Sequence, residues 1–96
     1  MNLIEKMKER RVPEELRKEL YLYLMHGRRP GHFLKAVLTN DLQGAVGRAD
    51  DATMRGLGAL VMFIYNEVPI AAKDVDTWCS QSQEEREKIW QSRGVL

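Results

Sequence analysis

The chain is organised around residues 26–42, HGRRPGHFLKAVLTNDL, which join a turn rich in glycine and proline directly to an apolar helical repeat. Gly27 ends one helix, and Arg28 and Arg29 lie in the turn before the next helix, which begins near Gly31. From Gly31 onward, large apolar residues recur every three or four positions, as they do on the buried face of a helix. The stretch therefore predicts two helices joined by a short basic turn.

The remaining sequence extends this helical pattern in both directions. Pro13 and Pro69 interrupt it, and Asn40 is expected to weaken or bend the third helix. No segment alternates apolar and polar residues as a half-buried strand would. We therefore predict one all-α domain over residues 1–96, a compact small bundle of about four to five helices. The expected helices are 2–11, 14–25, 32–47, 50–66 and 82–94, with a helical turn or two around 75–78.

Apolar stripes on the two middle helices supply much of the predicted core. The spacing of three and four residues places these side chains on one face of each helix, which we expect to be buried. The predicted core residues of these stripes are Leu34, Val37, Leu38, Leu42, Ala45 and Val46 in the third helix, and Met54, Leu57, Leu60, Val61, Ile64, Tyr65 and Val68 in the fourth.

The amino-acid composition is that of a globular domain and argues against a membrane protein and a general nucleic-acid binder. Of the 96 residues, 44% are hydrophobic and 30% are charged, which is typical of a soluble globular domain. No apolar run approaches the roughly 20 residues that span a bilayer, and the charged N-terminus does not resemble a secretory signal, so we expect no membrane partner and a cytoplasmic location. The net charge of +1 argues against a general nucleic-acid binder, although residues 1–35 hold nine Lys or Arg against five Glu.

The chain offers few groups for catalysis or for metal binding. Cys79 is the single cysteine, and His26 and His32 are the two histidines. A disulfide within the chain is therefore impossible, and a cysteine-based zinc site has too few ligands. No nucleophile and base occur at an informative spacing. We expect a non-enzymatic protein with no catalytic residues, no metal and no cofactor.

The basic turn is the first candidate for a binding site. Arg28 and Arg29 can grip a phosphate or carboxylate bidentately, and Gly31, His32 and Lys35 lie at the start of a helix, where backbone N–H groups attract anions. Phosphate-bearing small molecules suit this chemistry. The alternative is a solvated loop, because the pattern matches neither a P-loop nor a dinucleotide fingerprint.

Three aromatic residues one turn earlier form the second candidate. Tyr21, Tyr23 and His26 could stack on a base and bond its edge. The alternative is that tyrosines beside leucines on a helix belong to the core or to an interface. A third cluster, around Asp50 and Asp51, is better explained by helix capping than by acid–base chemistry.

A longer pattern resembles a widespread family of small proteins encoded by tailed bacteriophages. It comprises a helix ending in Gly, a Pro-containing turn, Phe-Leu-x-Ala-Val-Leu-x-Asn-Asp-Leu, then Ala-Asp, then Tyr-Asn-x-x-Pro, and it covers about residues 12–78. Family members usually carry Trp-Gly-Ser after the proline segment, where this chain has Ala71-Ala72-Lys73. The resemblance implies an accessory protein that acts in the cytoplasm of an infected bacterium, with no settled activity to carry over.

Three functional hypotheses follow. The leading one is an anti-defence protein that sequesters a phosphate-containing nucleotide signal, either a cyclic oligonucleotide or an ADP-ribose type. The second is a protein–protein module that inhibits a host defence or regulatory protein. The third, a small helix-turn-helix regulator, is disfavoured by its apolar third helix. We also expect a homo-oligomer, because residues 21–25 are apolar on every side and Gly56 and Gly58 would let another helix approach closely.

Overall fold

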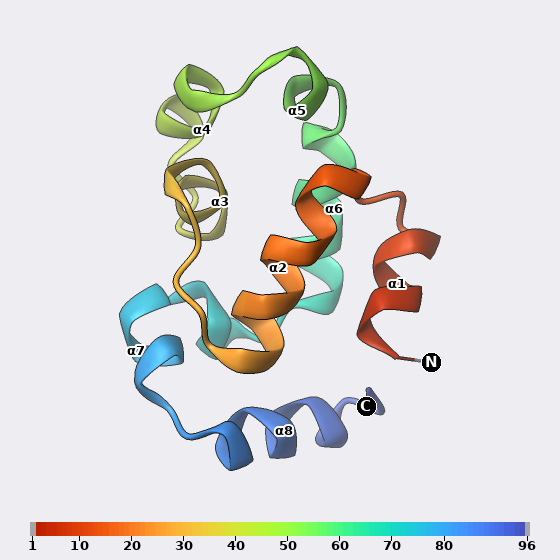
Figure 1. The fold of residues 1–96 in the computed structure, drawn as a ribbon, viewed down its shortest axis with the longest axis vertical. Helices are drawn as coiled ribbons and strands as arrows, with labels where there is room; N and C mark the ends of the chain where they lie inside the picture. The colour runs from red at the N-terminus through yellow and green to blue at the C-terminus, as the bar shows by residue number, and fades with distance from the viewer. Residues whose placement is uncertain (1, 96) are drawn as a thin grey trace.

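The chain folds into helices that surround α2, as a computed structural model describing residues 2–95 shows (Figure 1). Among these residues there are eight α-helices and one 3₁₀ helix, and no strand. The all-α class is confirmed, but the predicted number of four to five helices is too low. The helices are α1 (Leu3–Glu9), α2 (Glu14–His26), α3 (His32–Leu38), α4 (Leu42–Arg48), α5 (Asp51–Arg55), α6 (Leu57–Glu67), η1 (Ile70–Lys73), α7 (Val75–Ser80) and α8 (Gln83–Ser92).

Two of the predicted helices, 32–47 and 50–66, are each divided into two in the structure. These divisions account for most of the difference between the predicted and the observed number of helices. Asn40 has a left-handed backbone (φ 62°), so the helical path stops after α3, and the Asp41 side chain then caps α4 by accepting from the Gly44 N–H at 3.0 Å. Between α5 and α6, Gly56 lies against the Pro13 ring, and a Cβ at Gly56 would overlap that ring. Both breaks arise from single residues within otherwise helical patterns.

The core contains both tryptophans and the large apolar residues of α1, α2 and α6. The indole N–H of Trp78 donates to the Tyr23 carbonyl at 3.0 Å, and that of Trp90 donates to the Leu24 carbonyl at 2.9 Å. These carbonyls lie in the last turn of α2, where few intrahelical donors remain. Side chains from α7 and α8 therefore complete the hydrogen bonding at the end of the central helix.

Arg86 of α8 reaches the same end of α2. Its side chain is only 6% exposed, and its guanidinium donates to the backbone carbonyls of His26 (3.1 Å), Trp78 (3.0 Å) and Gln81. Gly27 ends α2 in the left-handed conformation (φ 70°), and a Cβ there would overlap this guanidinium. The fold thus requires glycine at position 27 for both its backbone angle and its space.

An ion-pair cluster attaches α1 to the end of α6. The Glu67 carboxylate lies 3.2 Å from Lys6 Nζ and 3.0 Å from Arg10 Nη2. Burial alone would raise the pKa of Glu67, but the hydrogen bonds and charges of Lys6 and Arg10 outweigh burial and lower the pKa below its ordinary value. The ionised form of Glu67 therefore stabilises the packing of α1.

Candidate functional site

The basic turn after α2 is exposed, but two carboxylates of the same chain already contact part of it. Arg29 forms an ion pair with Asp76 of α7, with Nη2 and Oδ1 2.8 Å apart. The hydrogen bond and charge of Arg29 lower the pKa of Asp76. The Gly31 N–H at the start of α3 donates to the Glu19 carboxylate of α2. An incoming anion would have to compete with Glu19 at the position predicted for phosphate.

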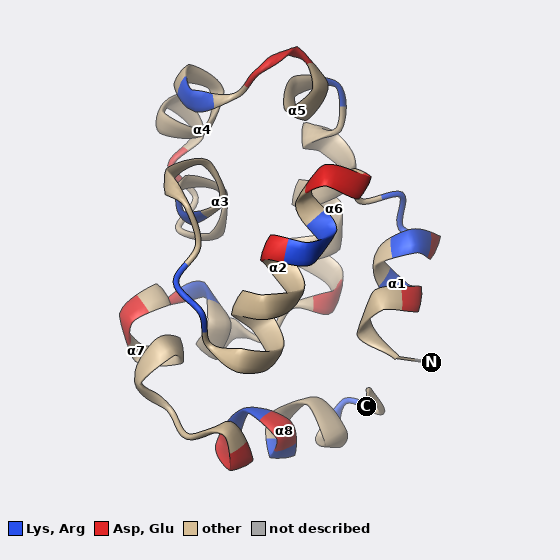
Figure 2. Ribbon diagram, viewed as in Figure 1, with Lys and Arg blue, Asp and Glu red and all other residues tan. Residues whose placement is uncertain are grey.

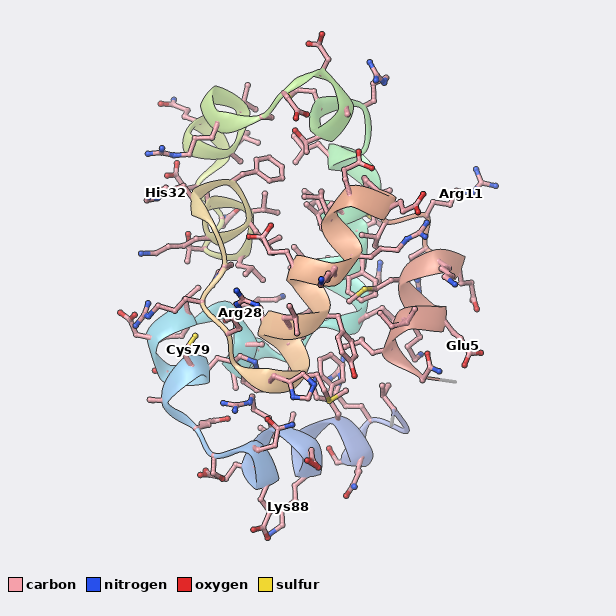
Figure 3. The ribbon with its side chains drawn as sticks, in the orientation of Figure 1. Glu5, Arg11, Arg28, His32, Cys79 and Lys88 are labelled. Carbon is pink, nitrogen blue, oxygen red and sulfur yellow. The ribbon has the colours of Figure 1, made fainter. Side chains whose placement is uncertain are left out.

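The eight predicted site residues do not converge on one pocket. Figure 3 shows Arg28 beside the C-terminal end of α2 and His32 farther along, beside α3 and α4. Arg28 and Arg29 line a hollow of about 440 Å³ with Lys18, whereas His32 and Lys35 line another of about 200 Å³. The structure therefore divides the predicted basic site into two.

The aromatic candidates are also separated from the basic turn. Tyr21 and His26 pack edge to face, with ring centroids 5.6 Å apart, and line a hollow of about 240 Å³ between α2 and α8. Tyr23 is fully buried, and its hydroxyl donates to the Ala72 carbonyl. Burial raises the pKa of Tyr23, and the charges of Cys79 and Asp74 raise it further. Tyr23 is thus a core residue here, in agreement with the alternative given for it above.

The largest departure from the sequence prediction is an exposed apolar face on α4, α5 and α6. Leu42 (65% exposed), Val46 and Met54 were expected in the core, as were Val61 and Tyr65 (74% exposed), yet the structure leaves all five on the surface. Within residues 2–95, all seven exposed large hydrophobic side chains lie between positions 42 and 70. They are Leu42, Val46, Met54, Val61, Met62, Tyr65 and Ile70.

A groove marks the line where α3 and α4 meet α6. It has a volume of about 110 Å³, and Leu42 and Ala45 line one side while Leu57 and Val61 line the other. This volume is below the 300–1,000 Å³ typical of small-molecule sites, so the groove suits a single apolar side chain. We call the exposed residues 42, 46, 54, 61, 62 and 65, together with this groove, the α4–α6 face.

Charge is nearly absent from the helix at the centre of this face. From Leu57 to Asn66, α6 carries no Asp, Glu, Lys or Arg, and the first charge is Glu67 at its end. Figure 2 shows the contrast, with blue and red segments along α1, α2 and α8 and tan along most of α6, although blue and red segments also mark α4, α5 and the loop between them. The sequence signal was available in the long uncharged run, but the same run is equally typical of a buried helix.

Two further features bear on the kind of site. In the part of the chain that the structure describes, no three His, Cys, Asp or Glu side chains gather closely enough to hold a metal ion. No helix within residues 2–95 has the length and apolar character needed to cross a membrane.

Searches for related proteins give no match with any protein-family model, curated protein or solved structure.

Proposed function

We propose that this chain is a non-enzymatic protein-interaction module that acts through the α4–α6 face. The observation that carries the proposal is the groove lined by the exposed side chains of Leu42 on α4 and Val61 on α6, and the other exposed large hydrophobic side chains of residues 2–95 also lie between positions 42 and 70. Scattered apolar residues are normal on a protein surface, but a gathered apolar region is typical of a protein-binding surface. Burying it contributes roughly 25 cal/mol for each Å² removed from water.

The resemblance to bacteriophage accessory proteins gives the proposal a biological setting. A phage protein of this kind would inhibit or redirect a host defence or regulatory protein in the bacterial cytoplasm. The α4–α6 face supports that role because it offers apolar area and a groove for one side chain, which are the parts of an interface that hold most binding energy.

A photo-crosslinking probe tests the proposed function. A benzophenone side chain placed at Met62, which is 53% exposed on α6, should form adducts with other polypeptide chains when the protein is irradiated in bacterial lysate. The same probe at Lys88, whose side chain is 71% exposed on α8, is the matched control. If the probe at Met62 yields no polypeptide adduct above the level at Lys88, the proposal is wrong.

A second candidate function, sequestration of a phosphate-containing nucleotide signal, has one observation in its favour. The hollow of about 440 Å³ brings Lys18 of α2 together with Arg28 and Arg29, and its volume suits a small ligand. Glu15 and Glu19 line the same hollow and oppose an anion. Tyr23 has no part in this candidate, because its ring is buried.

Titration calorimetry distinguishes this candidate from the first. A panel of cyclic dinucleotides and ADP-ribose cyclisation products should release heat with the wild-type protein, and Arg28→Ala and Lys18→Ala should each weaken binding about tenfold, since a charge-assisted hydrogen bond contributes about 1.5 kcal/mol or more. Arg93→Ala, a basic residue remote from the hollow, should bind as the wild type does. Absence of heat with every ligand would exclude sequestration of these signals.

A further inference from the structure

The hollow between α2 and α8, which we call the α2–α8 hollow, has a buried apolar floor. Met25, Trp90 and Val95 line it, and all three are buried. The indole N–H of Trp90 already donates to the Leu24 carbonyl, so this side chain offers the hollow only its carbon atoms. The volume of about 240 Å³ is just below the range typical of small-molecule sites. The α2–α8 hollow therefore suits a ligand with a single ring system.

A row of polar side chains from α8 lines the same hollow. Gln83, Glu87 and Gln91 are four residues apart, so they share one face of α8 with roughly 5–6 Å between successive Cβ atoms. The Oε1 atom of Gln83 accepts from Arg86 Nη2 at 3.2 Å, which leaves the Gln83 amide group free to donate. The row thus offers a ligand an amide donor one helical turn away from a carboxylate.

The carboxylate of Glu87 has no partner among residues 2–95, unlike those of the other two glutamates of α8. Glu84 pairs with Lys88 at 3.3 Å, and Glu85 accepts from the Ser82 N–H at 3.3 Å in the capping box. A ligand that enters the α2–α8 hollow removes water from Glu87, and this is costly unless the ligand supplies donors. A purely apolar occupant is therefore disfavoured.

Arg86 determines the charge of a suitable ligand. Its buried guanidinium forms no ion pair within residues 2–95, and it bonds Gln83 and the His26 carbonyl, which both belong to lining residues. Its positive charge lies behind the wall of the α2–α8 hollow and offsets the negative charge of Glu87. A neutral ligand is favoured over an anion or a cation.

The aromatic residues of α2 favour a flat ring. Tyr21 and His26 line the α2–α8 hollow with their ring planes at 76° and their centroids 5.6 Å apart. A flat ligand that stacks on one of these rings meets the edge of the other, which is the arrangement that aromatic groups prefer. Stacking on aromatic side chains and hydrogen bonding at the polar edge are how proteins hold single nucleobases.

We propose that the α2–α8 hollow binds a neutral heteroaromatic base with the polar edge of guanine. Guanine presents two adjacent N–H donors beside a carbonyl oxygen. The two donors match the two carboxylate oxygens of Glu87, and the carbonyl matches the free amide group of Gln83. Adenine places a ring acceptor beside its amino group, and this acceptor would repel one oxygen of Glu87.

This site is separate from the α4–α6 face and does not depend on the proposed function. Helix α8 lies at the opposite end of the molecule from α4 and α5 (Figure 1). It is also separate from the hollow that Lys18, Arg28 and Arg29 line, because no lysine or arginine lines the α2–α8 hollow. The proposed base site therefore requires no phosphate on its ligand.

An NMR titration of the isotope-labelled protein with guanosine tests the proposal. The side-chain amide signals of Gln83 and Gln91 and the indole N–H signal of Trp90 should shift and saturate. The indole N–H of Trp78 donates to the Tyr23 carbonyl away from the hollow, so its signal should stay in place as an internal control. Inosine, which lacks the amino donor of guanosine, and adenosine should each bind about tenfold more weakly.

Two matched variants locate the binding. Glu87→Gln should weaken guanosine binding about tenfold, because it replaces a carboxylate oxygen with a donor. Glu84→Gln removes a carboxylate of α8 that does not line the hollow, and it should bind as the wild type does. Both positions are exposed, so both variants should keep the spectrum of the folded protein.

Three results would each overturn the proposal. The first is the absence of shifts at about 1 mM guanosine. The second is equal binding of guanosine and adenosine, which would contradict recognition of the guanine edge. The third is unchanged binding by Glu87→Gln, which would mean that its carboxylate does not contact the base.

Discussion

The contact between Gly27 and Arg86 gives a prediction that can be worked out from the structure. Gly27→Ala has two costs, since a left-handed backbone strains alanine by about 1 kcal/mol and the new methyl group overlaps the Arg86 guanidinium. Displacing that guanidinium weakens hydrogen bonds to the carbonyls of His26 and Trp78, each contributing about 1.5 kcal/mol or more. The expected loss of stability is about 3 kcal/mol.

A double-mutant cycle separates these two costs. Arg86→Met keeps the apolar part of the side chain and removes the guanidinium, and it should itself destabilise the fold by about 2–4 kcal/mol because buried carbonyls lose their donor. In the Arg86→Met background the overlap is gone, so Gly27→Ala should cost only the backbone strain of about 1 kcal/mol. The coupling between the two positions is therefore expected to be about 2 kcal/mol.

Urea denaturation followed by tryptophan fluorescence measures all four proteins of the cycle, because Trp78 and Trp90 lie beside Arg86 in the core. Lys88→Met, at an exposed position on the same helix, is the control and should change stability by less than about 0.5 kcal/mol. Equal costs of Gly27→Ala in both backgrounds would refute the steric argument. A neutral Arg86→Met would mean that the desolvation of the buried cation cancels its hydrogen bonds.

Three further predictions concern single residues. Glu67→Gln should cost about 1 kcal/mol at neutral pH by removing the ion pairs with Lys6 and Arg10. Because the folded state lowers the pKa of Glu67, the difference in stability from the wild type should shrink as pH falls through the ordinary glutamate pKa of about 4.3, and it should vanish below the lowered pKa of the folded state. Burial raises the pKa of Tyr23, so stability should decline as pH rises above about 10, and Tyr23→Phe should remove an ultraviolet component that ionises only on unfolding. Because the φ of Asn40 is 62°, Asn40→Gly should raise the free energy of unfolding by about 0.5–1 kcal/mol and Asn40→Ala should lower it by a similar amount, and the melting temperatures should follow the same order. The opposite order would contradict a left-handed backbone at Asn40.

Much of the fold could be predicted from local sequence. The 3.6-residue periodicity predicted the helical class, and Pro13 and Gly27 marked the ends of α2. The sequence offered Asp50 or Asp51 as the cap of one helix and Ser80 or Ser82 as the cap of another, and the structure has Asp50 at α5 and Ser82 at α8. These features depend on neighbours within four residues, so they can be read along the chain. The third helix was expected to weaken or bend at Asn40, and the structure breaks it there. The break at Gly56 could not be placed in the same way, because glycine is tolerated inside a helix and the Pro13 ring that it meets lies far away in the sequence.

The candidate site could likewise be predicted only where it depends on local sequence. The amino-acid order establishes that the turn after α2 is basic and which residues of α3, α4 and α6 are apolar. The contacts of Glu19 and Asp76 with the turn, and the outward orientation of some apolar residues of α4 and α6, arise from tertiary packing and could not be predicted. Periodicity states which residues share a helix face, but it cannot state whether the chain has another element to cover that face. Among residues 2–95, the helices packed around α2 leave the α4–α6 face uncovered.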